Sequence, residues 1–153
     1  MHKTVTNLIQ IHSEIKEKIK ELKYTNYNPI VIAVSKTFNI KHISHLIDFG
    51  HLHYGENKVQ EALEKWTVPK QENSLIKLHM VGKLQTNKVK NAIKIFDYIH
   101  SVDNIKLARK IASENINQKK SVKIFIQVNL ANEEQKSGIS PNKVPEFVSL
   151  CKS

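Results

Sequence analysis

Two kinds of apolar pattern alternate along the chain. Short β-branched runs are typical of buried strands, whereas apolar residues spaced three or four positions apart mark one face of a helix. The strand-like runs are 30–34, 52–54, 75–81, 98–102 and 122–128. The helix-like segments are 7–22, 39–49, 57–66, 86–96, 105–116 and a last one that begins at Pro141. The stretch 67–74 contains Pro69 and is expected to be a loop, and Trp66 on an apolar helix face is expected in the core.

This alternation predicts right-handed βαβ units and a parallel sheet. No break in composition separates the units, so residues 1–153 are expected to form a single domain. Two α/β architectures fit the pattern. An open doubly wound sheet of five strands closes at about this length, whereas a (β/α)8 barrel needs about 250 residues and would be present here in part.

Lys36 follows the apolar run 30–34 directly, at the point where a strand of a parallel sheet ends. Ligands of α/β proteins bind at this edge of the sheet. A lysine that is partly desolvated there favours its neutral amine, which can attack a carbonyl group and form a Schiff base. The alternative is an ordinary lysine in solvent, because lysines are mostly exposed.

Polar or charged residues also follow the other strand-like runs. Asn57 follows the second, Gly82 and Lys83 follow the third, Ser101 lies at the end of the fourth, and Asn129 follows the fifth. The carboxyl ends of parallel strands lie along one rim, so these residues are expected to border a ligand site. Polar loop residues are common at strand ends without any site, which leaves the simpler explanation open.

Composition narrows the classes of partner. The formal net charge is +10, yet the basic residues other than Arg109 are lysines spread along the chain. Arginine makes most bidentate contacts to bases and phosphates, so specific nucleic-acid binding is not expected, although non-specific RNA binding through charge stays an alternative. No apolar run approaches the roughly 20 residues that span a bilayer. The single cysteine, Cys151, agrees with the cytoplasm.

Histidines are the main candidates for a metal site. His51 and His53 alternate along a strand-like run and could bind a metal together with His79. No clustered cysteine or carboxylate completes such a set, so no metal site is expected. Phosphate-binding glycine loops are also missing from the sequence, and its serines lack the setting of a catalytic triad.

Six ordered sequence motifs resemble one known family. They are Ala33–Thr37, Tyr54–Glu61, His79–Lys88, His100–Asp103, Gln127–Asn129 and Lys136–Ile139. Together they resemble the pyridoxal phosphate homeostasis proteins, which are similar to the N-terminal barrel of alanine racemase. The resemblance implies a partial (β/α)8 TIM-type barrel, made of a leading helix and about five βα units of parallel strands.

The resemblance also implies a cofactor. Lys36 would hold pyridoxal 5′-phosphate as a Schiff base, and Asn57, Ser101 and Asn129 would lie around the cofactor ring. Members of this family are cofactor-binding proteins that affect vitamin B6 balance, without established turnover, so enzymatic activity is not expected. The alternatives are a racemase-like enzyme, which would need a second acid/base group from another domain, and a non-functional fragment of the family.

The chain departs from the family at its end. Family members continue for several more strands, and the groups that bind the cofactor phosphate lie in that part. The sequence therefore predicts a barrel that is truncated at the C-terminus, with open edges at 30–34 and 122–128. Such a chain is expected to self-associate or to need a complementing chain that supplies the rest of the barrel.

Overall fold

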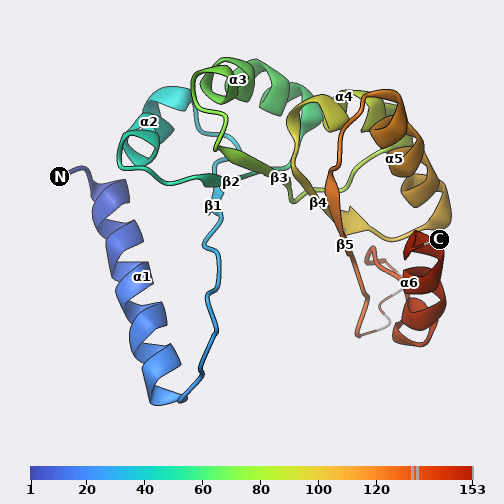
Figure 1. Ribbon diagram of the computed structural model, residues 1–153, viewed down its shortest axis with the longest axis horizontal. Coiled ribbons are helices and arrows are strands. Elements are labelled where there is room, and N and C mark those ends of the chain that lie inside the picture. The colour runs from blue at the N-terminus through green and yellow to red at the C-terminus, as the bar shows by residue number, and fades with distance from the viewer. Residues whose placement is uncertain (132, 134, 153) are drawn as a thin grey trace.

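The computed structural model describes residues 1–131, 133 and 135–152 (Figure 1). Its α-helices are α1 (Lys3–Glu21), α2 (Ile40–Asp48), α3 (Val59–Glu72), α4 (Val89–Ile95), α5 (Ile105–Asn117) and α6 (Val144–Lys152). Its strands are β1 (Ala33–Val34), β2 (His53–Glu56), β3 (Lys77–Met80), β4 (Tyr98–Val102) and β5 (Lys123–Ile126). Two short 3-10 helices, η1 (Thr86–Lys88) and η2 (Pro141–Lys143), precede α4 and α6.

The strands form one parallel sheet in the order β1-β2-β3-β4-β5. Each strand therefore pairs with the next one in sequence, and the order never reverses. A doubly wound sheet needs a point where the strand order reverses, whereas a (β/α)8 barrel adds its strands consecutively. The partial TIM-type barrel is confirmed, and the doubly wound alternative is wrong.

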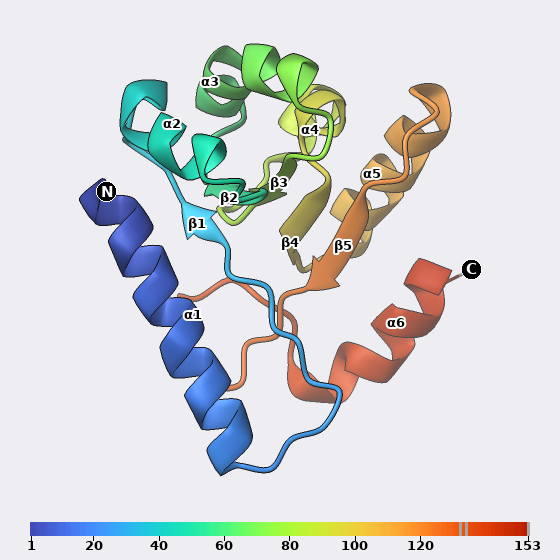
Figure 2. The same ribbon diagram turned by 60° about the vertical axis from the view of Figure 1, so that its left-hand side comes forward.

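Helices cover one face of the sheet. Figures 1 and 2 show α2 to α5 in a layer over this face, with α1 beyond the β1 end and α6 below β5. Alternate strand residues such as Tyr54, Leu78 and Ile99 are fully buried beneath this layer, and Trp66 of α3 packs on Tyr54 with ring centroids 4.5 Å apart. Trp66 thus lies in the core, as the apolar face of its helix predicts.

The first strand is shorter than the run 30–34 predicts. Pairing begins at Ala33, opposite Tyr54 of β2, and covers two residues. Ile30 is 59% exposed and Val34 is 49% exposed, so the expected burial of this strand is wrong. The physical reason is the position of β1 at an edge of the sheet, where β2 is its one neighbour among the described strands.

Helix α3 is longer than predicted, because it continues through the expected loop 67–74 as far as Glu72 with Pro69 inside it. Proline removes one N–H donor from a helix, but tertiary contacts can offset that loss. Lys70 Nζ donates to the carbonyl oxygen of Ile95 at 2.9 Å and forms an ion pair with Asp97. These bonds hold the last turn of α3 against the segment that leads into β4.

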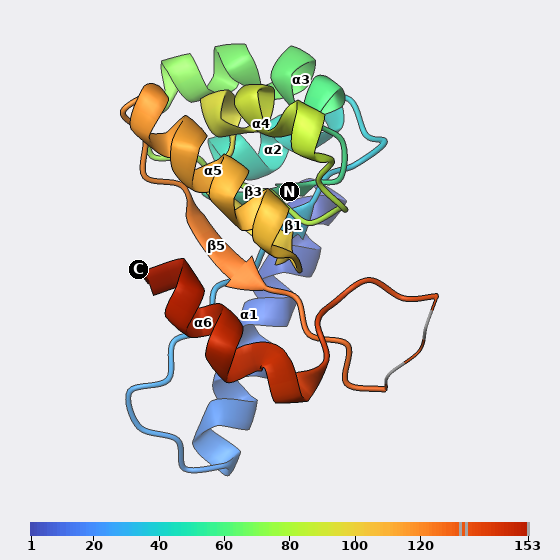
Figure 3. The same ribbon diagram turned by 90° about the vertical axis from the view of Figure 1, so that its right-hand side faces the viewer.

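Smaller differences occur at the two ends of the chain. Helix α1 begins at Lys3, because His2 Nδ1 accepts a hydrogen bond from the Thr4 backbone N–H. The last helical segment begins at Pro141 as predicted, with η2 leading into α6. Figure 3 shows α6 at the C-terminal end of the chain. Among the described residues, no helix is both long and apolar enough to cross a membrane.

Candidate functional site at the carboxyl edge of the sheet

The turn that carries Lys36 extends directly from β1. Ser35 N donates to the Gly55 carbonyl oxygen at 2.9 Å, which continues the β1–β2 ladder by one residue. Lys36 and Thr37 then form a turn, with Thr37 at a φ of 68°. The Lys36 side chain is exposed, so the predicted desolvation is wrong. Among the described residues, no hydrogen bond or ion pair involves its amine, which leaves that amine accessible to a ligand.

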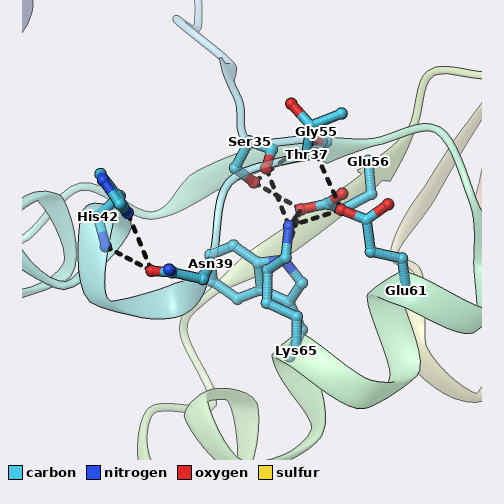
Figure 4. Close-up of polar contacts among 9 residues, drawn as sticks. Ser35, Thr37, Asn39, His42, Gly55, Glu56, Glu61 and Lys65 are labelled. Carbon is cyan, nitrogen blue, oxygen red and sulfur yellow. Dashed lines mark hydrogen bonds and ion pairs between the residues drawn. The ribbon is translucent and has the colours of Figure 1, made fainter.

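A buried carboxylate lies beneath this turn. Glu56, at the end of β2, is 0% exposed. Its Oε1 accepts hydrogen bonds from Ser35 Oγ at 2.7 Å and Lys65 Nζ at 2.8 Å (Figure 4). Trp66 Nε1 is a third donor, at 2.9 Å. Buried carboxylates are stable in proteins when they are paired and hydrogen-bonded, as Glu56 Oε1 is here. The other oxygen, Oε2, is buried without a hydrogen-bond partner among the described residues. Glu56 therefore ties the end of β1 to helix α3.

Lys65 and Glu61 complete the connection to the turn. Lys65 Nζ donates to the Ser35 carbonyl oxygen at 2.9 Å and to Glu61 Oε1 at 3.1 Å. Glu61 Oε1 also accepts the Thr37 backbone N–H at 2.9 Å. The hydrogen bond from Lys65, followed by that from Thr37, lowers the pKa of Glu61. We refer to Glu56, Glu61 and Lys65 as the Lys36 clamp, because they hold the residues on both sides of Lys36.

Two predicted cofactor residues carry buried polar atoms without partners. Asn57 directly follows β2, and Ser101 lies in β4. Asn57 Oδ1 and Ser101 Oγ are buried and have no hydrogen-bond partner within the described part of the chain. Such atoms are rare in folded proteins because each unmade bond costs stability. Both residues therefore have hydrogen-bonding capacity for a polar ligand, which fits the groups of a pyridoxal cofactor.

Asn129 lies in a different setting. Its Nδ2 donates to the Glu133 carbonyl oxygen at 2.8 Å, and its Oδ1 accepts from Glu133 N at 3.4 Å. It lines a cavity with Lys136 and Gly138, whereas Asn57 lines another one near the start of α3. The structure thus places Asn57 and Asn129 along the same edge of the sheet, but in separate cavities.

Histidines lie side by side on the sheet face opposite the helix layer. His79 Nε2 is 3.0 Å from His53 Nδ1, and His79 Nδ1 is 2.9 Å from His100 Nε2. His51 does not join them, since its Nε2 faces the His53 carbonyl oxygen at 2.8 Å. Among the described residues, no group of three or more potential ligand side chains has the geometry of a metal site.

Sequence reasoning assigned no role to the Lys36 clamp or to the pairing of His79 with His100. The spacing of Glu61 and Lys65 is that of an ion pair on one helix face, which was a usable indication. The contact between His79 and His100 depends on the register of neighbouring strands, and no local pattern reveals it.

Comparisons with known proteins identify relatives of this chain. No family model matches the sequence. The chain is 34% identical over 146 residues to the pyridoxal phosphate homeostasis protein of Pasteurella multocida strain Pm70, covering 95% of this chain and 61% of that relative. It is 29% identical over 151 residues to the protein of the same name from Escherichia coli K12, covering 97% and 64%. This chain is a homologue of the pyridoxal phosphate homeostasis proteins.

Solved structures agree with this homology. The structure of PipY from Synechococcus elongatus PCC7942 with PLP bound matches with a TM-score of 0.69 and 33% identity, over 88% of this chain and 64% of that one. An alanine racemase of Clostridium difficile 630 matches with a TM-score of 0.63 at 14% identity, over 81% of this chain and 33% of that one, which supports the barrel fold alone. The chain thus spans less than two thirds of these pyridoxal phosphate homeostasis proteins and of PipY.

Proposed function

We propose that this chain binds pyridoxal 5′-phosphate and contributes to intracellular pyridoxal phosphate homeostasis, with the cofactor held as a Schiff base on Lys36. The observation that carries the proposal is the position of Lys36, exposed in a turn at the carboxyl edge of a parallel sheet. Two comparisons support the proposal. The chain is homologous to proteins named for pyridoxal phosphate homeostasis, and it is similar to PipY, which was solved with PLP bound.

Lys36 would hold the cofactor through its amine, which in the neutral form can condense with an aldehyde with loss of water. The bound cofactor would supply an electron sink, which is its general property in proteins. Asn57 would accept a hydrogen bond through its unpartnered Oδ1, Ser101 would donate or accept one through its unpartnered Oγ, and Asn129 would approach from the β5 side. We propose a binding role and no turnover.

Absorbance after mixing with the cofactor tests this proposal. We expect a band at roughly 420 nm, the general signature of a pyridoxal Schiff base. Lys36→Ala should abolish the band, whereas Lys58→Ala, which removes another exposed lysine near the same edge, should keep it. Borohydride reduction followed by peptide mass mapping should place the adduct on Lys36. A band that persists in Lys36→Ala would show that another lysine binds the cofactor.

The location and the partners of the chain are also part of the proposal. We place it in the cytoplasm, in agreement with its single cysteine. The outer edges of β1 and β5 have no paired strand among the described residues. We propose that a second polypeptide, or a second copy of this chain, covers these edges, because unpaired strands readily pair with another chain.

A further inference from the structure

We propose that Glu61 is a positioning residue for Lys36, and that it acts through the backbone of Thr37 with Lys65 as its partner. This inference rests on the proposed function, because it assumes that Lys36 is the residue that binds the cofactor. It assigns a role to a helix side chain that does not itself need to touch the cofactor.

The turn after Lys36 has an unusual backbone conformation. Thr37 has a φ of 68°, in the left-handed region that β-branched residues rarely adopt. Such a conformation persists where surrounding contacts hold it. Glu61 Oε1 supplies such a contact through the Thr37 N–H at 2.9 Å. Without this bond, the turn is free to relax, and the backbone of Lys36, from which its side chain extends, loses its fixed orientation.

The side chains that hold this turn are themselves held in place by several hydrogen bonds. Lys65 has 8% of its side chain exposed, and it bonds Glu56, Glu61 and the Ser35 carbonyl oxygen at once. Three acceptors hold the Lys65 amine in one position. Lys65 therefore connects Glu61 to the buried carboxylate of Glu56. The residues on both sides of Lys36 are thereby bonded to a single helix, whereas the Lys36 side chain stays exposed. This arrangement restrains the backbone and leaves the reactive group accessible.

Glu61 is better suited to substitution than Glu56. Glu56 is fully buried, so its removal threatens folding. Glu61 has 29% of its side chain exposed on the first turn of α3, and its substitution should leave the core intact. Glu64 on the same helix is exposed and bonds the nearby Gln60, which makes Glu64→Ala a matched control of equal charge.

The experiment compares the wild-type chain with Glu61→Ala, Glu61→Gln and Glu64→Ala. Amide hydrogen exchange at Thr37 should accelerate by about tenfold or more in Glu61→Ala, because a hydrogen bond to a charged acceptor is lost. The rate of cofactor attachment to Lys36, followed by absorbance and borohydride trapping, should fall by about tenfold through lost orientation. Glu61→Gln keeps a carbonyl acceptor and should restore most of both properties, whereas Glu64→Ala should match the wild type.

The two measurements separate the two proposals. A wild-type chain that attaches no cofactor to Lys36 refutes the proposed function, and the positioning role with it, while exchange at Thr37 still shows whether Glu61 holds the turn. If the wild type attaches cofactor and Glu61→Ala attaches it at an unchanged rate, Glu61 has no positioning role. Faster exchange throughout the chain in Glu61→Ala, with a lower Tm, would show a general structural role and would also overturn the inference.

Discussion

The imidazole ring of His79 stacks on the ring of Tyr98, with centroids 4.4 Å apart and an interplanar angle of 4°. Both nitrogens of the same imidazole face histidines of neighbouring strands, His53 on β2 and His100 on β4. A neutral imidazole donates through one nitrogen and accepts through the other, so His79 can link its two neighbours without carrying a charge. The packing thus favours the neutral form.

The stability of the fold should therefore depend on pH. Burial, and then the proximity of His100 and His53, lower the pKa of His79 from 6.5 to about 4. Between pH 6.5 and about pH 4, His79 is mostly protonated in the unfolded chain and mostly neutral in the folded chain. Stability from His79 is therefore fully present above pH 6.5 and is lost as the pH falls toward 4. Urea unfolding at a series of pH values measures this loss.

Two histidine variants control the pH experiment. His79→Gln removes one titrating group and should reduce the pH dependence in this range, although it also lowers stability. Burial also lowers the pKa values of His51, His53 and His100, so part of the dependence should remain. His12→Gln changes an exposed histidine of α1 and should leave the dependence as in the wild type. An equally steep dependence in His79→Gln would assign the effect to other groups.

The core beneath the helix layer can be tested with two leucines from one segment. Leu78 in β3 is 0% exposed, whereas Leu75, just before that strand, is 63% exposed. We expect Leu78→Ala to lower the free energy of unfolding by about 2–5 kcal/mol through lost burial and a residual cavity. Leu75→Ala should change it by less than about 0.5 kcal/mol. Equal effects in denaturant titrations would contradict the described packing.

The spacing of apolar residues predicted most helices and strands, because an element that packs against one neighbouring layer has apolar residues at regular intervals. The face that contains Trp66 is an example, since its apolar spacing alone placed this residue in the core. The extent of β1 was not predictable in this way. It depends on where β2 begins to pair, and the exposure of Lys36 follows from the position of β1 at the sheet edge.

The same distinction explains the misassigned end of α3 and the missed histidine contacts. Pro69 indicated a loop, but Lys70 reaches Ile95 and Asp97, which are distant in sequence and hold the helix in place. Within the candidate site, the order of the strand ends was predictable from the alternation. The hydrogen bonds of the Lys36 clamp were not, because they depend on how α3 lies over β1 and β2.

Gly82 should be required for the position of Asn57. A Cβ atom at residue 82 would lie 2.5 Å from the Asn57 carbonyl oxygen and 2.8 Å from its Cα, so backbone would have to move. We expect Gly82→Ala to destabilise the fold by about 1–3 kcal/mol and to weaken cofactor binding by displacing Asn57. Gly55→Ala is the control, since its Cβ would meet side chains, the nearest at 3.2 Å. Unfolding and cofactor titrations that rank Gly55→Ala as the more harmful change would contradict this account.

The sheet face opposite the helix layer should cause the isolated chain to self-associate. Val34 on β1 and Phe125 on β5 are 49% and 51% exposed, and both strands lie at edges of the sheet. Exposed apolar side chains next to unpaired strands favour association, which a charge on the strand opposes. Sedimentation velocity should therefore show concentration-dependent oligomers of the wild type and a shift toward monomer in Phe125→Lys.

Ile116→Lys is the control, at the end of α5 where the side chain is 78% exposed. This variant should associate like the wild type, because the position lies away from the strand edges. A wild-type chain that stays monomeric at all concentrations and unfolds cooperatively would show that the edges need no second polypeptide.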